Sequence, residues 1–201
     1  MTAPPPGLTT VRITGDRVML RPFGVDEVGR FAALVTAPDA GTAMAPGASF
    51  AWPLGFPPQD HLRERIESSG RFVHSLLELA IEAEGAFVGS IQARNPAPCF
   101  PPGVFMVGIA IAPESRGKGF GREAIALLVT HLFRQEGAQR VEMPTDVENV
   151  PMRTVAERLG FVMEGVLRSL MPMGDVRRDY CMYAMTRNDW EKTRRRWTRP
   201  S

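Results

Sequence analysis

Residues 105–124 read FMVGIAIAPESRGKGFGREA, and the fold can be predicted outward from this stretch. Its first eight residues are an apolar run rich in β-branched side chains, which predicts a buried strand that ends at Pro113. Beyond the glycines, apolar residues recur at helical spacing from Ile125 to Phe133. A helix that continues to about Gln135 would be capped by Gly137. The stretch therefore predicts a buried strand, a basic glycine-rich turn and a helix.

The turn itself has the features of an anion site. Three glycines precede or open the helix, so free backbone N–H groups point outward at the positive end of the helix dipole. Glycine lets the main chain approach a ligand closely, and Arg116, Lys118 and Arg122 add positive charge. These residues alone predict a ligand that carries phosphate.

Two general phosphate-binding motifs can be compared with the sequence of the turn, and only one of them fits its spacing. A Walker loop is excluded because Lys118 is followed by Gly119, so no hydroxyl is placed for magnesium. The dinucleotide fingerprint fits better, since Gly119, Gly121 and Ala124 satisfy its spacing and Glu142 follows about 20 residues later. That motif normally lies in a tight turn directly after the first strand of its domain, which is not the setting here. The dinucleotide hypothesis stays open as an alternative.

A third motif matches more of the chain. Residues 116–121 (RGKGFG) fit [QR]-x-x-G-x-[GA] and resemble the acyl-CoA pyrophosphate loop of the GNAT N-acyltransferases. The flanking sequence resembles the branch that contains the ribosomal-protein-alanine N-acetyltransferases. Residues 149–161 (NVPMRTVAERLGF) are similar to the second signature of that branch, and residues 13–23 (ITGDRVMLRPF) are similar to its opening strand. The resemblance covers roughly residues 11–190.

The resemblance implies the GNAT fold, of mixed α/β (α+β) class. We expect a central, mostly antiparallel twisted sheet with a splayed parallel pair at the coenzyme A site, flanked by helices. The expected organisation is a disordered N-terminal tail at 1–10, a single acyltransferase domain at 11–190 and a basic C-terminal tail at 191–201. At 201 residues, one domain is also the expectation from length.

The resemblance also implies acetyl-CoA, or another acyl-CoA, as co-substrate. It assigns coenzyme A contacts to the 105–112 strand, to the turn and to one asparagine, namely Ile109, Ala110, Ile111, Arg116, Gly117, Lys118, Gly119, Gly121, Arg122 and Asn149. Asn149 has a structural alternative, because an Asn ahead of Pro151 can cap the next helix. The 38–58 loop contains three aromatics that either line the acceptor pocket or plug the domain edge: Phe50, Trp52 and Phe56.

The usual acid and base positions of the family are not filled by acids or bases here. In this branch a serine often lies three residues after the asparagine, but that residue here is Met152. Other branches have a tyrosine seven residues after the asparagine, where this chain has Ala156. A carboxylate that is common on the strand is replaced here by Met106. Three carboxylates remain as candidate bases: Glu78, Asp146 and Glu148.

The composition narrows the class of protein. A hydrophobic content of 44% and a charged content of 23% are ordinary for a soluble globular domain. A net charge of +2 does not call for a nucleic-acid partner, and no signal peptide or 18-residue apolar span is evident. Cys99 and Cys181 do not form a metal motif. We expect a cytoplasmic monomer or homodimer without metal or membrane contact.

The leading hypothesis is an N-acetyltransferase in which a primary amine attacks the thioester directly. The acceptor would be a protein N-terminus, an amino acid or a small-molecule amine. One alternative is a coenzyme A-binding protein with weak or no catalysis, because the usual acid and base positions are changed. The other is a dinucleotide-binding oxidoreductase.

Overall fold

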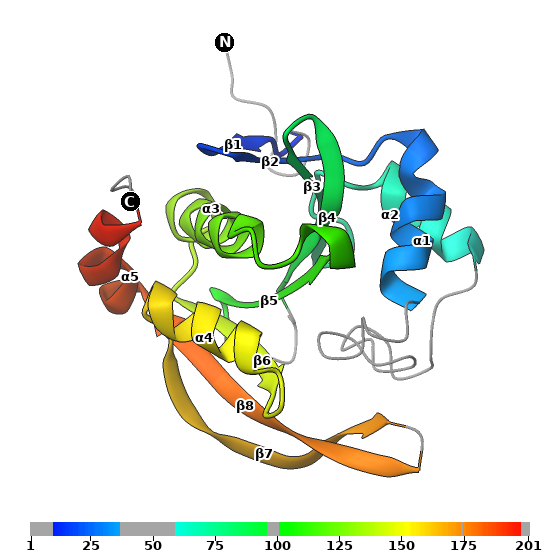
Figure 1. Ribbon diagram of the computed structural model, residues 1–201. Coiled ribbons are helices and arrows are strands. Elements are labelled where there is room, and N and C mark those ends of the chain that lie inside the picture. The colour runs from blue at the N-terminus through cyan, green and yellow to red at the C-terminus, as the bar shows by residue number, and fades with distance from the viewer. Residues whose placement is uncertain (1–9, 37–58, 96–100, 174, 198–201) are drawn as a thin grey trace.

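A single mixed sheet organises the molecule. The computed structural model describes residues 10–36, 59–95, 101–173 and 175–197 (Figure 1). Eight strands in these residues form one sheet in the order β1-β2-β3-β4-β5-β6-β8-β7, in which only β5 and β6 pair in parallel. This confirms the expected mostly antiparallel sheet with one parallel pair. The strands are β1 (Ile13–Thr14), β2 (Val18–Arg21), β3 (Leu76–Ala83), β4 (Ala86–Arg94), β5 (Val104–Ile111), β6 (Arg140–Asp146), β7 (Val162–Met173) and β8 (Val176–Thr186).

Helices cover both faces of the sheet. In Figure 1, α3 and α4 lie on one side of the central strands, and α1 and α2 lie on the other. The helical elements are η1 (Val25–Glu27), α1 (Val28–Thr36), α2 (Gln59–Glu67), η3 (Pro113–Ser115), α3 (Phe120–Gln135), α4 (Val150–Leu159), α5 (Arg187–Thr193) and η4 (Arg194–Arg196). None of the helices in the described ranges is long and apolar enough to cross a membrane.

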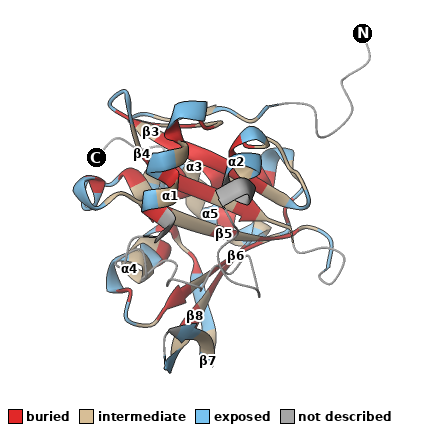
Figure 2. Cartoon of the chain, turned by 90° about the vertical axis from the view of Figure 1, so that its right-hand side faces the viewer, coloured by how far each residue is buried: buried red, intermediate tan, exposed pale blue. Residues whose placement is uncertain are grey.

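The core is built on the apolar stripe of α3. All five stripe residues are at most 1% exposed: Ile125, Leu128, Val129, Leu132 and Phe133. They pack with alternate residues of the strands, such as Leu77, Leu79 and Ile91. Figure 2 shows that buried residues gather in the central strands, whereas the β7–β8 hairpin is largely intermediate or exposed. The helical period read from the sequence therefore identified the central packing face.

The opening segment is a hairpin rather than one strand. The chain turns between β1 and β2, so Ile13 pairs with Leu20 and Thr14 with Met19. The carboxylate of Glu123, in the first turn of α3, accepts hydrogen bonds from the backbone N–H groups of Arg17 and Val18 at 2.9 and 3.1 Å. This long-range contact fixes the hairpin turn against the start of α3.

The C-terminal segment packs on the domain. The rings of Trp190 and Phe133 stack with centroids 5.2 Å apart. Further along, the Trp197 indole N–H donates to the carbonyl of Leu159 at 3.2 Å. The tail that was expected to start at residue 191 therefore begins inside α5. Trp190 and Trp197 attach this segment to the domain, whereas its sequence indicates only a basic stretch.

Candidate functional site

The parallel pair opens after three residues. Pairing between β5 and β6 runs from Val104 opposite Arg140 to Met106 opposite Glu142. Beyond that point β5 stays paired with β4 as far as Ile111, while β6 stays paired with β8. The edge of β5 that faces β6 therefore has no strand partner in the described sheet beyond Met106. Such an edge presents backbone donors and acceptors to an extended ligand.

The glycine-rich turn lies directly after this free edge. The chain passes through η3 and reaches Gly117 and Gly119, whose φ angles of +74° and +87° favour glycine. Gly119 is the N-cap of α3. A Cβ atom on either glycine would have no neighbour within 4 Å, so both lie at an open surface. The first N–H groups of a 16-residue helix point toward this surface.

The third glycine of the turn is different. Gly121, the second residue of α3, does not have a positive φ. A Cβ atom there would lie 3.4 Å from Cγ1 of Ile111 and 3.7 Å from Cδ1 of Ile109, which are ordinary contacts. The positive φ angles therefore favour glycine at 117 and 119, whereas neither the backbone nor the packing requires it at 121.

Positive charge surrounds the turn from two parts of the chain. Lys118 and Arg122 are exposed, and Arg116 donates from Nε to the carbonyl oxygen of Ile111 at 2.9 Å. Arg17, from the β1–β2 turn, donates to the carbonyl oxygen of Lys118 at 3.0 Å and lies 4.7 Å from the ring centroid of Phe120. Sequence reasoning missed Arg17, since it lies about a hundred residues earlier in a turn without a motif.

Asn149 has the structural role that the sequence offered as an alternative. It is the N-cap of α4, and its side-chain oxygen accepts a hydrogen bond from the N–H of Met152 at 3.1 Å. Its side chain lies at the end of the segment that follows β6, and the residue is 8% exposed. A contact between Asn149 and coenzyme A stays a prediction.

The three candidate bases have different surroundings. Glu78 is buried, and Arg65 of α2 donates to both of its oxygens at 2.7 and 2.8 Å. Glu148 is exposed and forms an ion pair with Arg178. Asp146, at the end of β6, is 1% exposed and accepts a hydrogen bond from the N–H of Glu148 at 2.8 Å.

Asp146 is the carboxylate whose surroundings favour the protonated form. Burial raises its pKa above the ordinary value, nearby Arg178 opposes this shift, and Asp179 adds to it. A raised pKa brings a carboxylate closer to the range in which it exchanges a proton near neutral pH. The role of Asp146 as a base stays a prediction.

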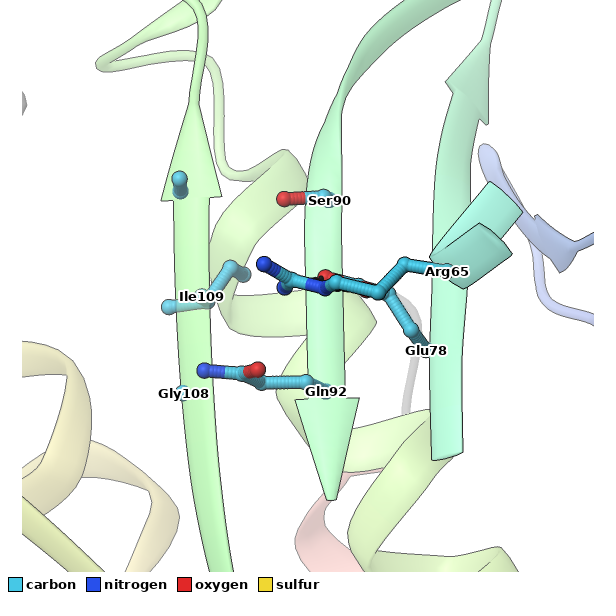
Figure 3. A pocket seen from close by; sticks show the side chains of 7 residues that line it. Arg65, Glu78, Ser90, Gln92, Gly108 and Ile109 are labelled. Carbon is cyan, nitrogen blue, oxygen red and sulfur yellow. Dashed lines mark hydrogen bonds and ion pairs between the residues drawn. The ribbon is translucent and has the colours of Figure 1, made fainter. Parts of the chain in front are cut away.

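A polar pocket lies on the sheet face toward α2. Glu78, Gln92 and Gly108 form one row across β3, β4 and β5. The pocket is also lined by Arg65, Ser90, Ile109 and Ala110. Figure 3 shows the Arg65 side chain reaching across β4 toward β5, and the Gln92 side chain reaching from β4 toward Gly108. A Cβ atom on Gly108 would lie 2.9 Å from Nε2 of Gln92, so glycine makes room for this amide.

The pocket adds residues that the sequence did not indicate. Arg65 and Gln92 belong to no motif, and they meet Ile109 only because of strand register and the position of α2. Three predicted acceptor-site residues lie outside the described residues: Phe50, Trp52 and Phe56. Within the described chain, no group of three His, Cys, Asp or Glu side chains is arranged to hold a metal ion.

The fold and the site together define a class of protein. A mostly antiparallel sheet opens at its single parallel pair beside a glycine-rich turn, which suits an extended ligand with phosphate at one end. The chain belongs to the GNAT acetyltransferase family, because the family model described as "Acetyltransferase (GNAT) domain" matches residues 17–162.

Individual relatives agree with this family. YdaF of Bacillus subtilis, provisionally named a ribosomal N-acetyltransferase, is 33% identical over 85 residues, which are 42% of this chain and 46% of YdaF. The prophage-derived N-acetyltransferase YokL of the same organism, itself uncharacterised, is 30% identical over 118 residues, or 56% of this chain and 63% of YokL. The matches therefore span less than two thirds of either relative.

A solved structure shows the same fold. RimJ of Mycobacterium smegmatis, in complex with CoA-disulfide, superposes with a TM-score of 0.74 over 94% of this chain and 93% of that chain. The two sequences are 21% identical, so the likeness is one of fold.

Proposed function

We propose that this protein is an acetyl-CoA-dependent N-acetyltransferase that acts on a primary amine. The observation that carries the proposal is the free edge of β5 beside the turn at the start of α3. This edge and this turn suit two parts of one ligand, since acyl-CoA combines an amide-containing arm with a pyrophosphate. Membership of the GNAT family supports the same ligand.

The residues have the chemistry that such a ligand needs. The β6-facing edge of β5 along Ile109, Ala110 and Ile111 would pair with the pantetheine arm, because this edge has no strand partner there, although Arg116 holds the carbonyl oxygen of Ile111. The pyrophosphate would lie on the amides of the turn and of the first turn of α3, with nearby positive side chains. The residues proposed for it are Arg116, Gly117, Lys118, Gly119, Gly121 and Arg122, joined by Arg17.

The reaction is a transfer of acetyl from sulfur to nitrogen, and bound acetyl-CoA supplies the thioester. The amine nitrogen forms a bond to the carbonyl carbon, the carbon–sulfur bond breaks, and one proton passes from the nitrogen to solvent or a base. A backbone N–H of the free β5 edge near Ile109 would polarise the carbonyl oxygen. The thiolate needs little help as a leaving group, because a thiol has a pKa of roughly 8.5.

Among the candidate bases we assign the proton acceptor to Asp146. Both oxygens of Glu78 are already held by Arg65 in a two-point hydrogen bond, which gives Glu78 a structural partner. Glu148 is exposed and paired with Arg178. Asp146 combines burial with a raised pKa on a strand that borders the open pair.

A coenzyme A-binding protein with weak catalysis is the second candidate. It is favoured by Met106, Met152 and Ala156, which occupy the positions where the resemblance to the family implies proton-transfer groups. The dinucleotide-binding alternative is set aside. It requires an open parallel sheet, whereas the described sheet has one parallel pair.

Thiol release from acetyl-CoA with a panel of amines tests the proposal. The panel contains N-terminal peptides, because YdaF is provisionally named a ribosomal N-acetyltransferase, together with amino acids and small amines. We expect amine-dependent release of free thiol and an acetylated product that is 42 mass units heavier, the mass of an acetyl group less one hydrogen. Tight binding of coenzyme A without turnover of any amine would favour the second candidate instead.

A further inference from the structure

A second guanidinium lies beside the Arg65–Glu78 pair. Arg94 ends β4 on the same face as Gln92, since residues two apart on a strand share a face. Its Nη2 donates to Oε1 of Gln92 at 3.0 Å. Within the described chain Arg94 has no carboxylate within ion-pair distance, and its buried Nε has no hydrogen-bond acceptor.

The charge of this cluster is not balanced. Arg65 and Arg94 contribute two guanidinium groups, and Glu78 contributes one carboxylate, which Arg65 already holds in a two-point hydrogen bond. Burial lowers the pKa of Arg94 to about 10, with repulsion from Arg65 adding to the shift and Glu78 opposing it. Arg94 is still charged at neutral pH. A partly buried cation without a counter-ion is costly, so an anion that pairs with it would be bound favourably.

The cluster is connected to the pocket through one side chain. Gln92 contacts Arg94 through its Oε1, and its Nε2 lies over Gly108 in the pocket (Figure 3). Arg94 is opposite Met106 in the sheet, three residues before Ile109 on β5. At a rise of about 3.3 Å per residue, the two positions are separated by roughly 10 Å along the strand. An anion at Arg94 would therefore be several bonds away from an amine at the thioester.

We propose that Arg94 binds an acidic group of the acceptor, so that the preferred substrates are amines bearing a carboxylate several bonds from the amino group. This inference rests on the proposed function, because it assigns the acceptor to the pocket beside Ile109. Gln92 orients the Arg94 guanidinium. Arg65 holds both oxygens of Glu78, so this carboxylate does not neutralise Arg94.

Matched acceptors that differ only in charge test the proposal in the wild-type protein. One pair is 6-aminohexanoate and 6-aminohexanamide, and the other is the peptide amides Ser-Ala-Asp-Ala and Ser-Ala-Asn-Ala. Charge-assisted hydrogen bonds contribute enough for a preference of roughly ten- to a hundredfold in kcat/KM for the acidic member. The first pair reports on a small-molecule acceptor and the second on a peptide acceptor.

The Arg94→Gln variant should remove that preference while leaving affinity for coenzyme A unchanged. The matched control is Arg63→Gln, which removes an exposed arginine of α2 two residues before Arg65 and should keep the preference. Arg94→Lys retains the charge without the planar fork and should keep part of the preference. If Arg94→Gln does not fold, the comparison of acceptors in the wild type and in Arg94→Lys still tests whether Arg94 causes the preference for acidic acceptors.

Binding of both acceptor pairs to the coenzyme A-loaded protein, measured by calorimetry, separates this inference from the proposed function. Tighter binding of the acidic member that is lost in Arg94→Gln supports the inference, even if no amine is acetylated. Turnover of amines with equal kcat/KM for the acidic and amide members overturns the inference and leaves the proposed function intact. Equal binding of the two members, including no binding of either, also overturns it when turnover is absent.

Discussion

At the scale of single residues, the surroundings separate side chains that look alike in sequence. Glu78, Asp146 and Glu148 are three candidate bases with no motif to rank them. In the structure the first is bound by Arg65, the last is exposed beside Arg178, and Asp146 is buried. Burial disfavours a charged carboxylate. The ranking therefore depends on contacts that no local pattern encodes.

Asp146→Asn should lower activity without lowering stability. The amide still accepts the hydrogen bond from the N–H of Glu148, but it cannot take a proton from an amine. Loss of a general base typically costs about 100-fold or more in kcat. Both kcat and the melting temperature should be measured on the same preparation, and an unchanged kcat would exclude Asp146 as the base.

The pH dependence follows from the direction of the same pKa shift. Because the folded-state pKa of Asp146 is raised, ionisation of this group costs folding free energy above that pKa, and the cost disappears as the pH falls below the unfolded pKa. Asp146→Asn should thus be as stable as wild type or more stable at neutral pH. The kcat of the wild type should fall at low pH as Asp146 becomes protonated, and this fall should be absent from the pH profile of the variant. A fall in stability at neutral pH would show a structural role instead.

At the scale of elements, the turn before α3 combines two kinds of glycine. Gly117 and Gly119 adopt positive φ angles, which the turn geometry requires. Gly121 is helical, and a methyl group there would make ordinary contacts with Ile109 and Ile111. A glycine that the fold does not require is best explained by a ligand that approaches the helix at this point.

Substitution by alanine should separate these two kinds of glycine. Gly119→Ala forces a side chain into the left-handed region and should destabilise the fold by about 1–2 kcal/mol. Gly121→Ala should leave stability unchanged or raise it by up to about 1 kcal/mol, since alanine favours a helix. It should nevertheless weaken coenzyme A binding by roughly tenfold, or about 1.4 kcal/mol.

Denaturant unfolding and equilibrium binding of coenzyme A check both variants. Gly137→Ala is a useful comparison, because this glycine also has a positive φ and open space around it but follows the far end of α3. It should lose stability and keep its affinity for coenzyme A. Unchanged affinity in Gly121→Ala would contradict the placement of the pyrophosphate at this turn.

At the scale of the whole molecule, the open parallel pair divides the sheet. One part consists of β1 to β5, and the other consists of β6, β8 and β7, joined by three residue pairs between β5 and β6. Helix α3 and the shared core also hold the two parts together. A ligand that lies along the free edge of β5 and reaches the segment around Asn149 would contact both parts.

Coenzyme A should therefore raise the thermal stability of the whole domain. A ligand at 100 times its Kd stabilises the folded state by about 2.7 kcal/mol. For a chain of this size, that corresponds to a rise in Tm of roughly 5–10 °C. Differential scanning fluorimetry with coenzyme A, and with NADPH as the control, measures the effect. A shift with NADPH alone would contradict the proposed ligand.

Much of the fold was predictable because it depends on local patterns. The stripe from Ile125 to Phe133 repeats at the helical period, and its residues form the core. The strand before Pro113 and the turn after it were also identified, since an apolar run and glycine clusters report on backbone structure. The first hairpin was not, because a tight turn at residues 15–17 interrupts one continuous strand-like pattern.

The sequence by itself determined the family, the glycine-rich turn and the position of the parallel strand before it, since these depend on residues close together in the chain. Only the tertiary structure decided which side chains meet. Arg17 reaches the turn from the first hairpin, and Arg65 of α2 meets Gln92 and Arg94 of β4. Such contacts depend on strand register and helix placement, and a shift of one residue would send each strand side chain to the opposite face.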